Sequence, residues 1–159
     1  MLNNTKELYI FLDKIFVAHG FCRKKDTFYF STDECICFFT IVKSSLSGHY
    51  DHVMGCFFKE IMIDKDDFPK YYKNHLKFSL THLANRNIVK QVFDFENHSY
   101  KYDEREKIIK KLIEEKALPF LKDISTKEGI LKAVDKYKDL VHYIIGDLIT
   151  HLGIPYPSK

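Results

Sequence analysis

Glycine is scarce in this chain, and its scarcity removes several classes of site. Only 6 glycines occur among 159 residues, and they are scattered. A phosphate-binding loop needs clustered glycines before a helix, so the sequence contains none. Gly-x-Ser-x-Gly and Cys-x-x-Cys are also absent, which leaves no nucleophile elbow and no redox or zinc motif of the CxxC kind.

Arginine and long apolar runs are scarce too. Arginine stands only at positions 23, 86 and 105, in a chain of net charge +3 whose other basic residues are lysines. Nucleic-acid recognition favours the arginine fork, so this imbalance counts against nucleic acid as a partner. No apolar run approaches the roughly 20 residues that span a bilayer, and the N-terminal segment carries acidic residues where a signal peptide is apolar. We therefore expect a cytoplasmic protein with no membrane segment.

The four cysteines predict packing rather than chemistry. Cys22, Cys35, Cys37 and Cys56 lie in or beside apolar, strand-like segments. Without a secretory signal, we expect reduced thiols in the core. Cys35 and Cys37 would point to the same face of one strand, too far apart to bridge easily, and no companion ligands stand at zinc spacing. The sequence predicts no metal site and no cofactor.

What the chain does contain is apolar and aromatic. Hydrophobic residues make up 45% of it, and it has 14 Phe and 10 Tyr. That apolar area is enough to offset the entropy of ordering, and a chain of this length can bury a core without disulfides or metals. We expect one folded domain over residues 1–159.

Residues 28–63 carry apolar, β-forming runs broken by two turn-like clusters, which is the pattern of a β-meander. We predict strands at 27–31, 35–43 and 49–62. The second is apolar on both faces, so both faces must be covered. Gly55, in the middle of the third strand, indicates a bulge or close packing.

The segments around this meander are less regular. Residues 44–48 connect the second strand with the third. Residues 75–83 alternate as a strand does but also fit a helical spacing, and we favour the strand. A further strand is predicted at 88–95.

Helices precede and follow the strands. Apolar residues at three- and four-residue spacing predict a helix over 4–19, with Asn4 and Glu7 as its cap. The clearest helical stripe spans 137–152, and we expect it to cover the strand at 35–43. The order of helix, strands and helices predicts an α+β fold, in which an antiparallel four- or five-stranded meander sheet is packed by an N-terminal helix and C-terminal helices.

Two capping boxes mark helix starts in the C-terminal half. Asp103 with Glu106 opens one helix, and Ser125 with Glu128 opens another. Pro119 interrupts or restarts the helix between them.

Five short motifs follow one another in an order typical of one family. They are a helix ending in His-Gly-Phe before basic residues and an aromatic strand (19–30), a strand ending in Lys-Ser (39–44), an aromatic strand with an embedded glycine (50–55), a His-x-x-Phe-x-Leu strand (75–80), and Ala-Leu-Pro-Phe-Leu before a capped helix (117–125). Over residues 5–135 the chain thus resembles the DUF4304 family, a bacterial group of uncharacterised function. The resemblance favours the strand at 75–83 and implies no activity.

The chain departs from that family at two polar positions. Ser79 stands where the family commonly has a basic residue, and Val42 stands where a glutamine usually precedes the Lys-Ser pair. If those positions line a site in relatives, that site is altered here.

None of the eight histidines has a local partner at metal-ligand spacing. A pair from neighbouring strands, such as His52 with His75, is left open. No exposed serine or cysteine stands beside a base, so we assign no catalytic residue. The histidines nearest one another in sequence would point to opposite faces of their strand or helix: His49 and His52, His75 and His82, His142 and His151.

Two surface features could contact a partner. The basic cluster at 23–25 lies beside an aromatic strand and could stack single-stranded nucleic acid, although a solubilising strand edge explains it better. Tyrosine suits half-wet contacts, and the aromatic excess makes a pocket or interface lined by some of four tyrosines a second hypothesis. These are Tyr50, Tyr71, Tyr72 and Tyr102.

We expect a non-enzymatic binding or protein-interaction domain of unknown specificity, a class that includes immunity proteins. The excess of basic residues argues against an inhibitor of a basic nuclease toxin, which needs an acidic face. The alternative is a small-ligand-binding protein or an enzyme with a pocket on the sheet face. The candidate ligand or interface residues are polar groups that lie in or end apolar strands: Lys43, Ser44, Tyr50, His52 and His75.

Overall fold

The computed structural model describes residue 2, residues 4–44 and residues 50–158. His49 and the predicted connection at 44–48, apart from Ser44, therefore lie outside the described residues.

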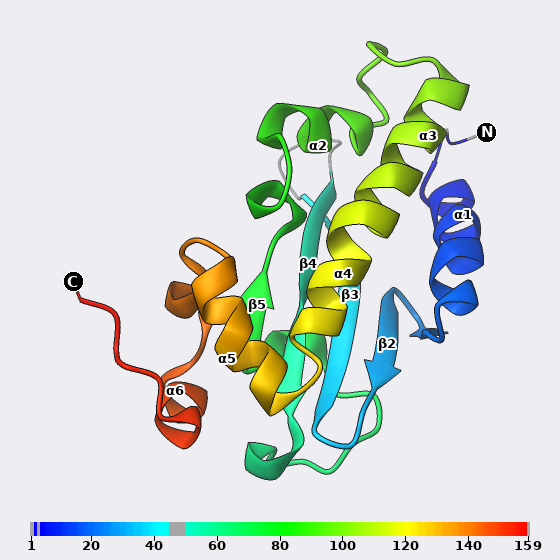
Figure 1. Ribbon diagram of the computed structural model, residues 1–159. Coiled ribbons are helices and arrows are strands. Elements are labelled where there is room, and N and C mark those ends of the chain that lie inside the picture. The colour runs from blue at the N-terminus through cyan, green and yellow to red at the C-terminus, as the bar shows by residue number, and fades with distance from the viewer. Residues whose placement is uncertain (1, 3, 45–49, 159) are drawn as a thin grey trace.

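A five-stranded antiparallel sheet stands at the centre of the fold (Figure 1), and its strands are ordered as they occur in the chain. This confirms the predicted meander and the α+β class. The strands predicted at 27–31 and 35–43 have the predicted bounds, whereas the third strand ends earlier than predicted, at Phe58. The strands are β1 (Cys22–Lys24), β2 (Thr27–Ser31), β3 (Cys35–Lys43), β4 (Tyr50–Phe58) and β5 (Leu76–Phe78).

The central pair of strands explains the glycine in β4. β3 and β4 are paired along their whole length, from Cys35 opposite Phe58 to Lys43 opposite Tyr50. On the other side of β4, the backbone of β5 comes so near to Gly55 that an added Cβ would lie 1.8 Å from the carbonyl oxygen of Leu76. Close packing, one of the two alternatives predicted for this glycine, is therefore the reason for it.

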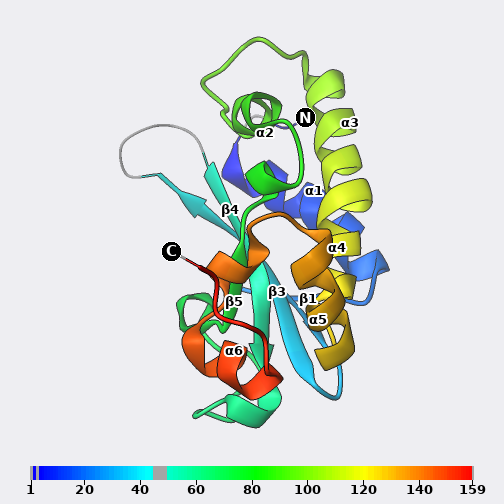
Figure 2. The ribbon, with the colours of Figure 1, turned by 60° about the vertical axis from the view of Figure 1, so that its left-hand side comes forward.

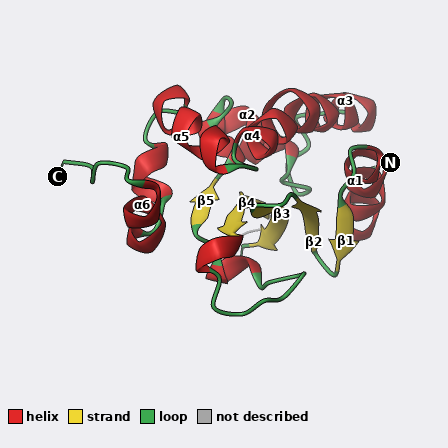
Figure 3. Ribbon diagram, turned by 60° about the horizontal axis from the view of Figure 1, so that its bottom comes forward, coloured by secondary structure: helices red, strands yellow, loops and turns green. Residues whose placement is uncertain are grey.

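Helices cover one face of the sheet (Figure 3). On this helix-covered face the ring of Phe16 lies 5.0 Å from that of Phe39 in β3, and the thiol of Cys37 lies 3.5 Å from the carbonyl oxygen of Leu121. Another helix, α6 (Gly146–Leu152), lies beyond the β5 edge. The covering helices are α1 (Thr5–Ala18), α2 (Arg86–Val92), α3 (Tyr102–Leu112), α4 (Leu118–Asp123) and α5 (Lys127–Lys136).

The other face is covered by the connection between β4 and β5 (residues 59–75), which we term the covering loop. The loop contains two 3-10 turns, η1 (Lys59–Ile61) and η2 (Tyr71–Lys73). Four side chains of the sheet are buried beneath it, and Met62, Phe68 and Tyr71 of the loop pack against them. The four are Tyr29, Ile36, Phe38 and Phe57. The expectation that the 137–152 stripe covers β3 was therefore wrong, because α4 and the covering loop take the two faces.

The prediction of a strand at 88–95 is also wrong, because α2 occupies most of that segment. The side chain of Asn85 accepts hydrogen bonds from the backbone N–H groups of Asn87 and Ile88, both at 3.1 Å, which starts a helix. Val89 and Val92, three residues apart, are then buried on one side of that helix. In the segment at 75–83, the predicted strand is confirmed but is shorter than predicted, since β5 spans only Leu76–Phe78.

The 137–152 stripe does not form one helix. α5 ends at Lys136, and the backbone of Tyr137 is already extended. Asp139 then adopts a left-handed conformation with φ of 65° and precedes a 3-10 turn, η5 (Leu140–Tyr143). Ile144 then forms an isolated antiparallel bridge with Leu76, and the N–H of Ile145 donates to the carbonyl oxygen of His75 at 2.9 Å. The exposed edge of β5 thus draws this segment into an extended conformation before α6 begins.

The helix starts in the C-terminal half are shifted from their predicted positions. Glu104, not Glu106, accepts from the backbone N–H of Lys101 at 3.2 Å. Thr126, not Ser125, caps α5 by accepting from the N–H of Gly129 at 3.0 Å. A π-helical turn at Ile113–Ala117 joins α3 to α4 in one rod (Figure 2). Pro119 follows this turn near the start of α4, where its missing N–H is tolerated.

Candidate functional site

The loop-covered face of the sheet contains two neighbouring hollows, which share Asp66 and Lys70 as lining residues. The first, the His75 cavity, has a volume of about 450 Å³. The second, the lysine groove, has a volume of about 470 Å³. Both lie within the range of roughly 300–1,000 Å³ in which proteins hold small ligands or side chains.

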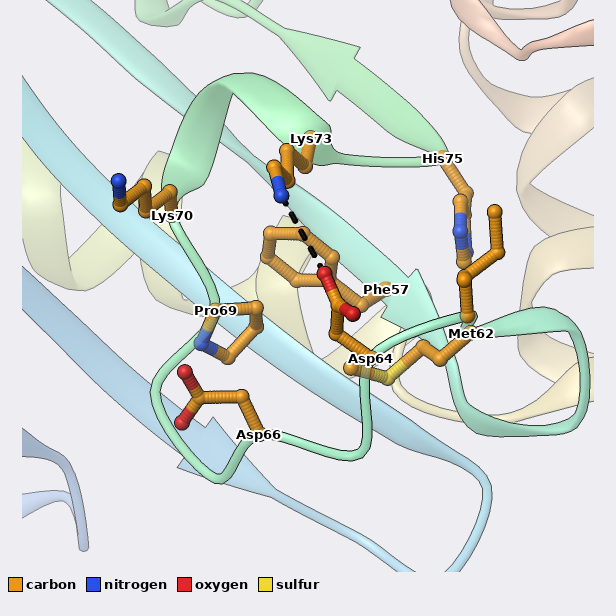
Figure 4. Close-up of a pocket in the computed structure, with 9 residues that line it drawn as sticks. Phe57, Met62, Asp64, Asp66, Pro69, Lys70, Lys73 and His75 are labelled. Carbon is orange, nitrogen blue, oxygen red and sulfur yellow. Dashed lines mark hydrogen bonds and ion pairs between the residues drawn. The ribbon is translucent and has the colours of Figure 1, made fainter.

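The His75 cavity lies between the end of β4 and the covering loop (Figure 4). Phe57, Met62 and Pro69 form apolar walls. Asp64 and Lys73 reach toward each other at the cavity, with 3.2 Å between Oδ2 and Nζ, and both side chains are more than half exposed. This exposed ion pair is weak, on the order of 0–1 kcal/mol, so it can open without disturbing the fold.

His75 contributes a hydrogen-bond donor to this cavity. The backbone N–H of Phe58 donates to Nδ1 of His75 at 2.8 Å, so the neutral ring carries its proton on Nε2. Burial lowers the pKa of His75 from 6.5, although the nearby carboxylate of Asp147 opposes the shift. The ring is therefore neutral at physiological pH, and Nε2 is available as a donor.

The lysine groove collects positive charge from three parts of the chain. Four lysines line it together with Tyr71 and Tyr72. The ammonium of Lys24 lies 5.0 Å from the ring centre of Phe68, and that of Lys70 lies 6.0 Å from the ring centre of Tyr72. Such contacts hold a lysine over an aromatic surface. The lysines are Lys24 at the end of β1, Lys25 directly after it, Lys43 at the end of β3, and Lys70 in the covering loop.

Polar contacts fix the floor and one wall of the groove. The hydroxyls of Thr27 and Thr40 are hydrogen-bonded across β2 and β3 at 3.1 Å. The hydroxyl of Tyr29 donates to the carbonyl oxygen of Pro69 at 2.8 Å, which fastens the covering loop to the sheet. Burial raises the pKa of Tyr29, so this phenol remains a donor at any physiological pH. The groove is thus a preformed surface.

The five site residues predicted from the sequence do not gather in one place. Lys43 lines the lysine groove, and half-buried Ser44 follows it directly. Tyr50 is buried on the helix-covered face, where its hydroxyl is hydrogen-bonded to that of Thr5 and its ring lies 5.6 Å from that of Phe95.

The two histidines among the predicted site residues are separated by the sheet. His52 is buried on the helix-covered face, with its ring centre 3.9 Å from that of Phe93. His75 lines a cavity on the opposite face. The pairing of His52 with His75, which the sequence left open, is therefore not formed.

The basic cluster and the four tyrosines are each divided by the structure. Nε of Arg23 donates to Asp13 of α1 at 2.8 Å, so this arginine packs away from the groove that Lys24 and Lys25 line. Tyr71 and Tyr72 line the groove. Tyr102 is exposed at the start of α3, on the other side of the sheet.

Sequence reasoning missed the contribution of the covering loop. Met62, Asp66 and Lys70 were not predicted to belong to a site, although they line the hollows. The length of the connection gave no signal, because the predicted strands at 49–62 and 75–83 left only residues 63–74 between them, within the roughly 12–15 residues of an ordinary loop.

Thiol and metal chemistry find no support in the part of the chain that the structure describes. Three of the four cysteines are buried and all four are free, and burial raises the pKa of the Cys37 thiol well above its usual range. Among residues 2, 4–44 and 50–158, no group of three or more His, Cys, Asp or Glu side chains is placed to hold a metal ion.

One of the two positions at which the sequence was expected to depart from the family lies on this face, where Val42 lines the lysine groove. Ser79 instead forms a hydrogen bond with Thr81 at 2.9 Å and caps the short 3-10 turn η3 (Leu80–His82).

Comparison with known proteins identifies the family of this chain but assigns no activity to it. Over the described residues, the structure contains no helix that is both long enough and apolar enough to cross a membrane. No curated protein and no solved structure matched the chain. A family model described as a domain of unknown function, DUF4304, matches residues 12–123, which include all five strands, the covering loop and both hollows. The chain therefore belongs to the DUF4304 family.

Proposed function

We propose that this protein is a non-enzymatic interaction domain of the bacterial cytoplasm that binds an acidic segment of a partner protein in the lysine groove. The observation that carries the proposal is that four lysines line one aromatic hollow: Lys24 of β1, Lys25 directly after it, Lys43 at the end of β3 and Lys70 of the covering loop. Like charges repel one another, so a cluster of this kind is best accounted for by an anionic partner.

A protein segment fits the groove better than a nucleic acid does. Asp26 and Asp66 stand among the lysines, and they would repel the continuous charge of a phosphate backbone. A polypeptide can place a neutral or basic side chain beside each of them. Tyr71, Tyr72 and the threonine pair on the floor also supply the half-polar contacts that are typical of protein interfaces.

The groove is held in shape before any partner arrives. Tyr29 fastens the loop at Pro69, and the ring of Tyr71 lies 6.4 Å from that of buried Phe38. A preformed surface loses little conformational freedom on binding, so more of the contact energy remains as affinity. An immunity protein that blocks an acidic surface of its target would be one example of such a domain.

Retention of a partner by groove and control variants tests the proposal. Wild-type protein is immobilised and exposed to nuclease-treated lysate of its own cells, in parallel with Lys43→Glu/Tyr72→Ala. The matched control is Lys110→Glu/Tyr102→Ala, which makes the same changes on α3, away from the groove. We expect a stoichiometric partner that wild type and control retain, that the groove variant loses, and that moderate salt elutes.

Two results would contradict the proposal. One is a partner that the groove variant retains as well as wild type does. The other is the absence of any stoichiometric partner at micromolar concentrations of immobilised protein. Retention of single-stranded DNA on filters at low salt, lost in Lys43→Glu/Tyr72→Ala, would favour nucleic acid instead.

A further inference from the structure

The His75 cavity differs from the lysine groove in its chemistry. Its charged lining residues are balanced, with Asp64 and Asp66 against Lys70 and Lys73. It therefore does not select for an anion. Its walls are the ring of Phe57, the thioether of Met62 and the ring of Pro69, which suit an apolar body.

A backbone hydrogen bond fixes the orientation of the His75 side chain in this cavity. Because Nδ1 of His75 accepts from the N–H of Phe58 at 2.8 Å, the ring is fixed in orientation and in tautomer. His75 lines the cavity, and Nε2 is the ring nitrogen that remains as a donor once Nδ1 is taken by the backbone. His75 as a whole is only 8% exposed, which makes this a nearly dry donor whose hydrogen bond to a ligand counts for more than one in water.

The rim of the cavity carries an apolar side chain that has no cover. Ile63 lines the cavity and is 97% exposed, the largest exposed fraction among the large hydrophobic residues of the described chain. It adjoins the Asp64–Lys73 ion pair. A ligand in the cavity would give Ile63 an apolar surface to contact, and this contact would shield it from water.

We infer that the His75 cavity is a site for a small neutral ligand with a planar apolar body and one hydrogen-bond acceptor, which accepts from Nε2–H of His75. The ring of the ligand lies against Phe57 and Met62, and its acceptor is a carbonyl oxygen or a ring nitrogen. This site goes beyond the proposed protein interaction and does not depend on it, since the charged contacts of the groove are not required.

Benzamide and 2-pyridone are suitable probes, because each joins a planar ring to a carbonyl acceptor. Toluene is the matched probe without an acceptor. Binding is followed by NMR through the methyl group of Met62 and the side-chain nitrogens of His75, in titrations that reach about 20 mM for the acceptor probes and the solubility limit in water for toluene. We expect saturable shifts with one of the two acceptor probes, and about fivefold to tenfold weaker binding of toluene, the usual loss for one hydrogen bond.

Two variants and one control assign the binding to the cavity. His75→Asn keeps an acceptor for the N–H of Phe58 and removes the Nε2 donor, so we expect the acceptor probe to bind about fivefold to tenfold more weakly. Met62→Trp fills the cavity and should abolish saturable shifts at His75, which keeps the test valid if His75→Asn fails to fold. His98→Asn changes an exposed histidine outside the cavity and should leave binding unchanged.

The inference is overturned if neither acceptor probe gives saturable shifts at Met62 and His75, or if toluene binds as tightly as both. It is also overturned if Met62→Trp binds as wild type does. Because the partner-retention experiment changes Lys43 and Tyr72, which do not line this cavity, failure of one proposal leaves the other standing.

Discussion

The two faces of the sheet use the same strands in different ways. On the helix-covered face, Cys37 and Phe39 of β3 join a large core with α1 and α4. On the opposite face, Phe38 belongs to a cluster of only four buried residues under a loop. The first face supplies most of the stabilising burial. The second face has lysines, tyrosines and a histidine at its two accessible hollows. Changes to these side chains should therefore affect binding more than the free energy of unfolding.

Two neighbouring phenylalanines offer the largest test of this difference. Phe39 and Phe38 are both fully buried, on opposite faces of β3. We expect Phe39→Ala to lower the free energy of unfolding by about 4–5 kcal/mol, since the helices cannot collapse into the cavity, and Phe38→Ala by about 3 kcal/mol, since the covering loop can. Urea unfolding of the two variants measures this. Equal losses, or a larger loss for Phe38→Ala, would contradict the comparison.

Gly55 tests how tightly β5 is held beside β4. A Cβ at this position would lie 1.8 Å from the carbonyl oxygen of Leu76, so the two strands must separate. We expect Gly55→Ala to cost about 2–3 kcal/mol of unfolding free energy, and Val53→Ala, on the same face of β4 but half-buried, about 1 kcal/mol. Thermal unfolding of both variants would show the order, and a Gly55→Ala variant as stable as wild type would rule out the close approach.

His75 makes the stability of the loop-covered face depend on pH. Its pKa is lowered in the folded protein from 6.5, mainly by burial, so the unfolded chain binds a proton more readily. Stability is therefore complete above pH 6.5 and falls as pH drops below that value, by at most about 1.4 kcal/mol per pH unit. His75→Asn should show a shallower fall as the pH drops below 6.5 in urea titrations. An unchanged slope would show that His75 is not the group responsible.

The tyrosine pair Tyr29 and Tyr137 gives the smallest and most local test. Tyr29→Phe removes the hydroxyl that donates to Pro69 and should cost about 1 kcal/mol. Amide hydrogen exchange should become faster within residues 68–73. Tyr137→Phe removes a donor to Asp123 on the helix-covered side, and we expect a similar loss of stability with unchanged exchange in the loop. Faster loop exchange in both variants would mean that the two faces are not independent.

The strands could be predicted because their signal is local. Apolar, β-forming runs and the turn-like clusters between them defined β2 and β3 at their observed bounds. The error at α2 came from β-branched residues, which favour strands in isolation. In the folded protein, the cap at Asn85 and the burial of Val89 and Val92 on one side stabilise a helix instead. The 137–152 stripe failed for a non-local reason. Its extended segment exists because the edge of β5 accepts it as a partner.

The candidate site was only partly predictable. Tyr50 and His52 stand at even positions of β4, as do buried Met54 and Cys56, so strand alternation alone would have assigned them to the core. Lys43 and His75 were found because they are polar groups at strand ends. The convergence of Lys24 and Lys70 could not be found, because it depends on how a long irregular loop crosses the sheet.

The most direct test of the division between the two faces measures stability and binding on one variant. For Lys43→Glu/Tyr72→Ala we predict an unfolding free energy within about 0.5 kcal/mol of wild type, since both side chains are exposed, together with loss of the partner that Lys110→Glu/Tyr102→Ala retains. A partner held as tightly as by wild type, or lost only because the variant is unfolded, would contradict the account.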